Sequence, residues 1–180
     1  ESGAPKRIYN FFTHAFGWLQ GGTPVIVVLL CAFFTALTGG SGVTILALGG
    51  ILYPLLTKEG YSEKFSLGLI TVSGSLGLLF PPSLPVIIYG VTAGVNVKDL
   101  FIQSFFPGVI LVLSMVAWVY FHGKRHKIEK SPFKWDKLKE SFLEAKWEII
   151  LPFLILTGVF SGYMTLVETA AFTVVYILTV

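Results

Sequence analysis

Hydroxyl side chains beside two breaks in long apolar stretches are the residues of this sequence best placed to do chemistry. The first break is a run of small residues at 39–42, and the second contains the prolines at 81 and 82. Interrupted helices leave backbone carbonyls without helical partners, and such carbonyls, together with hydroxyl oxygens, coordinate hard cations such as Na⁺. The candidate Na⁺ ligands are Gly39, Gly40, Ser41, Gly42, Thr44, Pro81, Pro82 and Ser83, and the candidate substrate contacts are Ser41, Ser73 and Ser83.

Each break also has a purely structural explanation. Small residues at 39–42 would permit close contact between helices, and the prolines would form a tolerated kink. Two breaks in consecutive apolar segments favour the ion-site hypothesis. On that hypothesis Ser41→Ala raises the Na⁺ concentration needed for half-maximal binding. Gly40→Val should have a larger effect, because a β-branched side chain blocks close approach and left-handed backbone.

The apolar stretches offer almost nothing to a catalytic mechanism. No Asp, Glu, Lys, Arg or His occurs in 24–57, 65–95 or 100–121, and the three histidines lie elsewhere without metal-ligand spacing. Glu168 has two interpretations, an intramembrane proton-transfer group or the capping partner of Thr165, and capping is the simpler. We therefore expect no enzymatic activity and no metal other than Na⁺.

The composition indicates an integral membrane protein. Of the 180 residues, 54% are apolar and only 13% are charged, whereas soluble domains carry about 25% charged residues. Such a chain is not a nucleic-acid-binding domain, a disulfide scaffold or a disordered tail. Its one cysteine, Cys31, cannot form an internal disulfide.

The charge-free stretch 24–57 would form a single helix of about 50 Å, which is too long for a bilayer. A break at 39–42 leaves two halves of about 22 Å each, and neither would cross a hydrocarbon core of about 30 Å. We therefore predict a re-entrant helical hairpin over 24–57 with its tip at 39–42.

The stretch 65–95 is interrupted at 80–85 by three prolines, which remove backbone donors and push Phe80 out of the helical region. This pattern predicts a broken transmembrane helix with free carbonyls at membrane depth. Ser62 and Asn96 are the predicted N-caps of this helix and of the next one.

Four further segments complete the predicted organisation. Residues 1–23 form an interfacial helix and a turn, for which an ordinary juxtamembrane helix is the alternative, and 100–121 form an uninterrupted transmembrane helix. Residues 122–148 form a basic loop followed by a surface helix through Leu138, Phe142, Ala145 and Ile149, and the lysine and arginine excess places the loop in the cytoplasm. Residues 149–180 contain another span and a truncated helix, so we expect a fragment cut at both ends.

Several short motifs follow one another in a specific order. They are Gly39-Gly40-Ser41-Gly42, Gly60-Tyr61-Ser62, Gly74-Ser75-Leu76-Gly77, Pro81-Pro82-Ser83, Tyr89-Gly90, Asp99-Leu100-Phe101, Pro107-Gly108, Ser161-Gly162 and Thr165 to Glu168. In this combination the whole chain resembles the large membrane (permease) subunit of TRAP (tripartite ATP-independent periplasmic) transporters. The doubled glycine at 39–40 departs from the common pattern of that family.

The resemblance implies an all-α membrane protein with the inverted repeat of a secondary transporter. Interfacial arm helices, re-entrant hairpins and broken helices make up that fold. The chain would hold the first repeat and, from 149 to 180, the start of the second. The implied function is Na⁺-coupled uptake of an organic anion, such as a C4-dicarboxylate or sialic acid, by an elevator-type movement in the bacterial inner membrane.

The partners implied by the resemblance are a small membrane subunit and an extracytoplasmic substrate-binding protein, with the lipid bilayer around the complex and no nucleic acid. A passive channel-forming subunit without ion coupling is the alternative, and it would show conductance without coupling. A non-transporting membrane scaffold is a third possibility, but it does not explain paired breaks flanked by hydroxyls.

Overall fold

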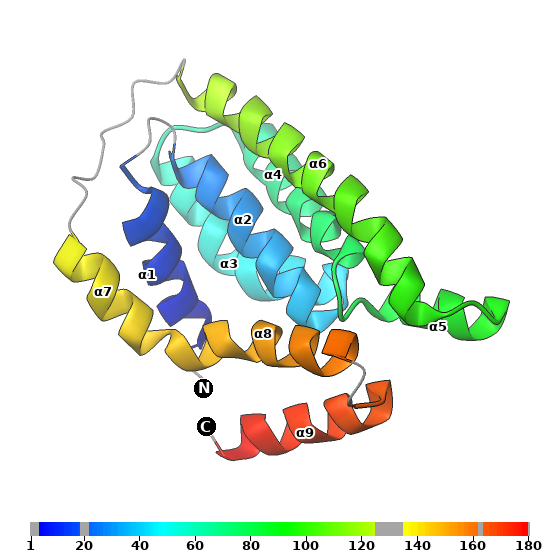
Figure 1. Cartoon of the computed structure of the whole chain (residues 1–180). Coiled ribbons are helices and arrows are strands. Elements are labelled where there is room, and N and C mark those ends of the chain that lie inside the picture. Colours follow the sequence, from blue (N-terminus) through cyan, green and yellow to red (C-terminus); the bar gives the residue numbers. More distant parts are fainter. Residues whose placement is uncertain (1–3, 19–21, 125–134, 162–163, 180) are drawn as a thin grey trace.

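The chain folds entirely into helices in the part that the structure describes. The computed structural model describes residues 4–18, 22–124, 135–161 and 164–179, which form nine α-helices and one short 3₁₀ helix without a β-strand (Figure 1). The prediction of an all-α protein is therefore confirmed. Most of the basic loop, at 125–134, lies outside the described residues.

Helix α2 (Gly22–Thr38) is at the centre of the molecule and forms a helical hairpin with α3 (Ser41–Lys58) (Figure 1). It packs against α1, α3, α4 and α6. Its residues from Pro24 to Cys31 are buried except for Leu29. An apolar sequence without a polar face is what a helix surrounded on all sides requires.

The two helices of the hairpin are longer than the sequence suggested. They contain 17 and 18 residues, because α2 already begins at Gly22 and because Ser41 and Gly42 belong to the first turn of α3 and not to the tip. Helix α3 is long and apolar enough to cross a membrane. The expectation that both halves are too short to cross is therefore wrong for α3.

The second broken segment consists of α4 (Glu63–Leu76), the 3₁₀ helix η1 (Gly77–Leu79) and α5 (Leu84–Ala93). The helix axis bends by 43° at the break. The break is shorter than predicted and ends at Ser83, the N-cap of α5. Pro85 lies in the first turn of α5, where a missing N–H group costs no helical hydrogen bond.

Two helices begin with side-chain caps at the residues that were predicted from the sequence, Ser62 and Asn96. The amide of Phe65 donates to the hydroxyl of Ser62 at 3.3 Å, and the amide of Lys98 donates to Oδ1 of Asn96 at 2.9 Å. The second cap opens α6 (Val97–Lys124). Together, α3 and α6 are the two described helices that could each cross a membrane, and the bent α4–α5 pair would be a third span.

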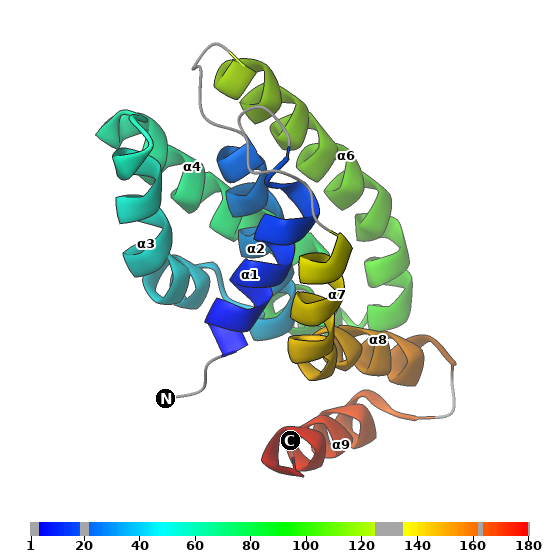
Figure 2. The same cartoon turned by 90° about the vertical axis from the view of Figure 1, so that its left-hand side faces the viewer.

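Helix α1 (Ala4–Phe16) lies beside α7 (Trp135–Glu144), as Figure 2 shows, and both contact α8 (Lys146–Ser161). The predicted surface helix is interrupted at Ala145, so Ile149 belongs to α8. One face of α1 makes the contacts: Arg7 forms an ion pair with Glu148, and Nδ1 of His14 lies 2.5 Å from the hydroxyl of Ser141.

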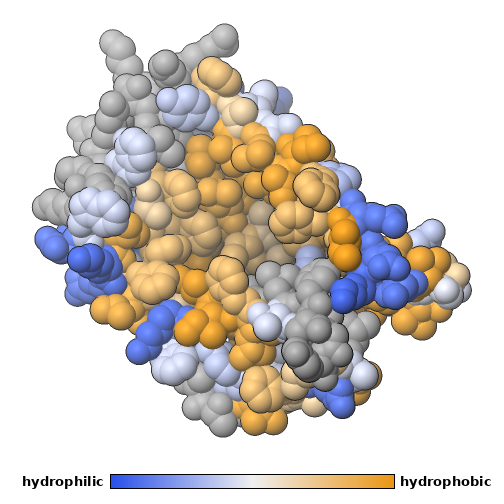
Figure 3. Space-filling view, in the orientation of Figure 1, coloured by the Kyte–Doolittle hydropathy of each residue, from blue (hydrophilic) through white to orange (hydrophobic). Residues whose placement is uncertain are grey.

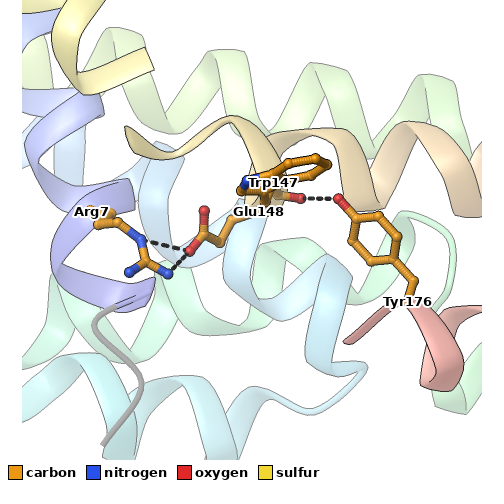
Figure 4. Close-up of polar contacts among 4 residues, drawn as sticks. All are labelled: Arg7, Trp147, Glu148 and Tyr176. Carbon is orange, nitrogen blue, oxygen red and sulfur yellow. Dashed lines mark hydrogen bonds and ion pairs between the residues drawn. The ribbon is translucent and has the colours of Figure 1, made fainter. Parts of the chain in front are cut away.

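The last helix, α9 (Leu166–Thr179), is attached to α8 by a polar contact next to that ion pair. The hydroxyl of Tyr176 donates to the carbonyl of Trp147 at 3.0 Å (Figure 4). At the start of α9, the amide of Thr165 donates to Glu168 at 2.7 Å, and the amide of Glu168 lies 3.2 Å from the Thr165 hydroxyl. This capping box confirms the simpler interpretation of Glu168.

Large apolar side chains cover much of the surface. Figure 3 shows them over the middle of the molecule, with hydrophilic side chains gathered along the edge formed by α7 and near the junction of α5 with α6. Leu46 on α3 and Phe106 on α6 are largely exposed. Such a surface suits a protein whose surroundings are lipid.

The open end of the hairpin is closed by the half-buried carboxylate of Glu59. The hydroxyl of Thr23, at the start of α2, donates to Oε1 of Glu59 at 2.8 Å, just after the end of α3. The other carboxylate oxygen, Oε2, is buried without a hydrogen-bond partner among the described residues. Burial raises the pKa of Glu59, and the hydrogen bond from Thr23 opposes this only partly.

We expect Glu59→Gln to stabilise the fold at neutral pH. Because the folded-state pKa is raised, the native state binds the proton more tightly than the unfolded state. The carboxylate therefore costs stability as pH rises above the unfolded-state pKa, and the cost is complete once pH exceeds the raised folded-state pKa. The amide keeps an acceptor for Thr23 and removes the buried charge. In thermal unfolding experiments in detergent, the variant should have a higher melting temperature than the wild type at about pH 8. This difference in melting temperature should shrink toward about pH 5. A difference that does not change with pH would contradict the charge explanation.

Candidate functional site

The hairpin tip and the helix break lie against each other. Gly39 at the tip has a φ of +66°, and a Cβ atom added there would lie 3.1 Å from the amide nitrogen of Leu84 and 3.3 Å from the carbonyl oxygen of Pro82. The tip backbone is therefore within van der Waals contact of the break backbone. The sequence hypothesis required two breaks facing each other, and the structure places them so.

Four helix ends meet at this junction. Helices α3 and α5 begin there, and α2 and η1 end there. Helix N-termini favour negative charge, and the unpaired carbonyls at C-termini favour positive charge. The junction can therefore attract a cation and an anionic group side by side. No cluster of three or more His, Cys, Asp or Glu side chains suited to a metal occurs among the described residues, so a cation here would have neutral oxygen ligands.

The tip residues differ in conformation, and the close approach and left-handed backbone expected at Gly40 are not found there. Gly40 is the N-cap of α3 with φ −140°, an extended conformation open to any residue, and a Cβ atom there would meet only Val43, at 3.6 Å. The left-handed glycine in close contact is Gly39 instead. Gly42 faces open space, with nothing within 4 Å of an added Cβ atom, and Ser41 is partly exposed.

Two candidate serine hydroxyls, one on α4 and one in the break, are fully buried without a partner among the described residues. The side chains of Ser73 and Ser83 have zero exposure, and neither hydroxyl has a hydrogen-bond partner among the described residues. Buried polar atoms are nearly always paired, so these two call for an explanation. Coordination of an ion or a substrate group would supply one, and both residues are sequence candidates.

A group of three threonines at the tip joins the candidate Thr44 to its surroundings. Thr44 is fully buried, and its hydroxyl lies 2.7 Å from that of Thr35 and 3.3 Å from that of Thr38. The hydroxyl of Thr35 also donates to the carbonyl of Gly74 on α4 at 2.8 Å. Thr35 and Thr38 are not among the candidates predicted from the sequence. Their spacing of three residues on the last turn of α2 was the available signal, since it puts both on one face.

Two glycines of the Gly74-Ser75-Leu76-Gly77 motif let α4 and η1 pack closely against the two helices of the hairpin. A Cβ atom at Gly74 would lie 2.7 Å from Ile45 of α3. A Cβ atom at Gly77 would overlap the carbonyl oxygen of Ala32 in α2 and lie 2.6 Å from Cβ of Thr35. The motif therefore sets the contact between the broken helix and the hairpin.

Comparison with known proteins gives a family for the whole sequence. The profile of the family described as "Tripartite ATP-independent periplasmic transporter, DctM component" matches residues 1–180. The C4-dicarboxylate TRAP transporter large permease protein DctM of Vibrio cholerae is 34% identical over 175 residues, which cover 97% of this chain and 39% of the relative.

Two more relatives show the same pattern. The isethionate TRAP transporter permease protein DctMQ of Oleidesulfovibrio alaskensis is 31% identical over 176 residues, 97% of this chain and 28% of its own length. The C4-dicarboxylate large permease protein DctM of Pseudomonas aeruginosa is 33% identical over 177 residues, 97% of this chain and 41% of its own length. The chain thus spans well under half of the length of these relatives.

Proposed function

The chain belongs to the DctM family of tripartite ATP-independent periplasmic transporters, and we propose that the protein carrying it takes up an organic anion coupled to Na⁺. The family consists of transporters and not of enzymes, in agreement with the sequence analysis. The names of the relatives mention C4-dicarboxylate and isethionate, both organic anions. An organic anion is accordingly the substrate class proposed here.

The contact between tip and break is the observation that carries the Na⁺ proposal. The backbone of Gly39 lies against the backbone at Pro82 and Leu84, and the unpartnered hydroxyl of Ser83 is buried in the same break. Carbonyl and hydroxyl oxygens at such a junction of interrupted helices form a Na⁺ site without any charged ligand. The proposed ligands are the carbonyls at 39–42 and 81–82 with the hydroxyls of Thr44 and Ser83.

The same proposal includes the setting of the protein. It works in the bacterial inner membrane with a small membrane subunit and an extracytoplasmic substrate-binding protein, and it moves substrate by an elevator-type displacement. The name DctMQ of one relative supports a small membrane partner. Two described helices long enough to cross a bilayer support the membrane location. The inverted repeat requires a second hairpin and a second broken helix outside this sequence.

We expect Ser83→Ala to raise the Na⁺ concentration for half-maximal uptake by about 5- to 150-fold, the range for losing one buried polar partner worth about 1–3 kcal/mol. Ser41→Ala should have a smaller effect, because Ser41 is partly exposed. The measurement is uptake by the complete transporter with its partners in proteoliposomes, titrated with Na⁺.

Ser114→Ala provides the matched control, since the exposed Ser114 hydroxyl donates to the carbonyl of Ile110 in its own helix, at 2.7 Å, and to no other group among the described residues. If Ser41→Ala and Ser83→Ala both keep the wild-type Na⁺ dependence, neither hydroxyl is a ligand. Ion conductance without coupled uptake would favour the alternative of a passive channel.

A further inference from the structure

The hydroxyl of Thr35 connects three helices at the junction. Its side chain is fully buried on α2, and Oγ1 lies 2.8 Å from the carbonyl oxygen of Gly74 on α4 and 2.7 Å from Oγ1 of Thr44 on α3. The neighbouring backbone is equally close, because Gly77 has no room for a Cβ atom against Thr35. Thr35 is thus fixed in position from two sides.

The hydroxyl of Thr35 donates toward both Oγ1 of Thr44 and the carbonyl of Gly74, so its single proton lies between two acceptors. The hydroxyl of Thr44 has a different acceptor for its own proton, the carbonyl of Gly40 at 3.3 Å. Oγ1 of Thr44 therefore accepts from Thr35 with one lone pair, and its second lone pair is directed away from Thr35. The Thr38 hydroxyl, 3.3 Å from that oxygen, lies on the side of the tip.

We infer that Thr35 is a positioning residue that orients the Thr44 hydroxyl for binding a cation at the tip. The inference rests on the proposed Na⁺ site, in which Thr44 is one of the ligands. A hydroxyl that coordinates a cation must turn a lone pair toward the ion and its proton elsewhere. The Thr44 proton points to the carbonyl of Gly40. Thr35 supplies a buried donor that occupies one lone pair of Thr44 and so fixes the direction of the other, and its contact with Gly74 keeps this donor at a fixed distance from the broken helix.

Two substitutions separate this role from simple space filling. Thr35→Val keeps the shape and removes the hydroxyl, whereas Thr35→Ser keeps the hydroxyl and removes a methyl group. In Na⁺ titrations of uptake by the complete transporter in proteoliposomes, we expect Thr35→Val to raise the half-maximal Na⁺ concentration about tenfold. Thr35→Ser should stay within about twofold of wild type, and the substrate concentration for half-maximal uptake at saturating Na⁺ should not change in either variant.

Ser66→Ala is the matched control for the loss of a buried hydroxyl. Ser66 is also fully buried, and its hydroxyl donates at 3.0 Å to the carbonyl of Ser62 within one helix. This variant should lose stability but keep the wild-type Na⁺ dependence. The ratio of Li⁺-driven to Na⁺-driven uptake should change in Thr35→Val and not in Ser66→Ala, because ligand orientation affects ion selectivity and general destabilisation does not.

The outcomes distinguish this inference from the proposed function. If wild-type uptake requires Na⁺ and Thr35→Val has the wild-type Na⁺ dependence, the inference is wrong and the proposed function stands. An equal shift in Thr35→Ser would also overturn it, because the shift would then come from the lost methyl group. If wild-type uptake does not require Na⁺, the Na⁺ coupling is wrong and the inference falls with it. Should Thr35→Val not fold, Thr35→Cys, with a weak donor in the same place, must still raise the half-maximal Na⁺ concentration.

Discussion

Gly77→Ala is expected to prevent the protein from accumulating in a folded form. The added Cβ atom would overlap the carbonyl oxygen of Ala32 and would lie 2.6 Å from Cβ of Thr35 and 2.8 Å from the amide nitrogen of Ala36. Two of these three atoms belong to the backbone of α2, so no side-chain rotation relieves the overlap. Overpacking typically costs about 1–3 kcal/mol, and displacing the central helix places this variant at the upper end of that range or beyond.

Gly68→Ala is the control for this experiment. Gly68 lies in the middle of α4 with nothing within 4 Å of an added Cβ atom, and alanine in a helix is favoured over glycine by up to about 1 kcal/mol. Expression and the melting temperature in detergent should therefore fall sharply for Gly77→Ala and stay level or rise for Gly68→Ala. Comparable behaviour of the two variants would show that α2 and η1 are not in backbone contact.

The positions of the two breaks could be predicted because they depend on local chemistry. Adjacent prolines cannot continue a helix, and a run of glycine and serine in a charge-free stretch of this length must interrupt it. The caps at Ser62, Asn96 and Thr165 were predictable for the same reason, since each depends on residues only a few positions away.

What the sequence could not provide was the way these elements meet. The Gly74 and Gly77 positions were recognised only as a motif, because their neighbours on α2 and α3 lie about 30 to 45 residues earlier. In the sequence, nothing distinguishes Thr35 from other threonines of apolar helices. Only the structure shows that the carbonyl oxygen of Gly74 on α4 lies 2.8 Å from the Thr35 hydroxyl. Contacts of this kind depend on helix rotation and crossing, which spacing along one helix does not determine.

The doubled glycine, Gly39-Gly40, is another case in which the sequence alone does not predict the contacts of each residue. From the sequence, Gly39 and Gly40 are equivalent, and the greater sensitivity was expected at Gly40. The structure gives Gly39 the left-handed conformation, with φ +66°, and the contact with Leu84, whereas Gly40 has an ordinary extended conformation and free space. The residue that ends α2 and the residue that caps α3 therefore have different requirements.

We expect Gly39→Ala to weaken Na⁺ dependence strongly and Gly40→Ala to leave it nearly unchanged. An L-residue in left-handed backbone costs about 1–2 kcal/mol, and the new Cβ atom would lie 3.1 Å from the amide nitrogen of Leu84 and 3.3 Å from the carbonyl oxygen of Pro82. The tip must then move away from the break. At about 1.4 kcal/mol per decade, the half-maximal Na⁺ concentration should rise about 5- to 30-fold.

The measurement is a Na⁺ titration of uptake by the complete transporter, with melting temperatures of both variants recorded in parallel. Gly40→Ala is the matched control, because its Cβ atom meets only a methyl group of Val43 at the ordinary distance of 3.6 Å. A larger effect at Gly40 than at Gly39 would contradict the tip geometry. Since the two glycines are adjacent and chemically identical, a difference between their variants must come from the left-handed backbone of Gly39 and its contact with the break.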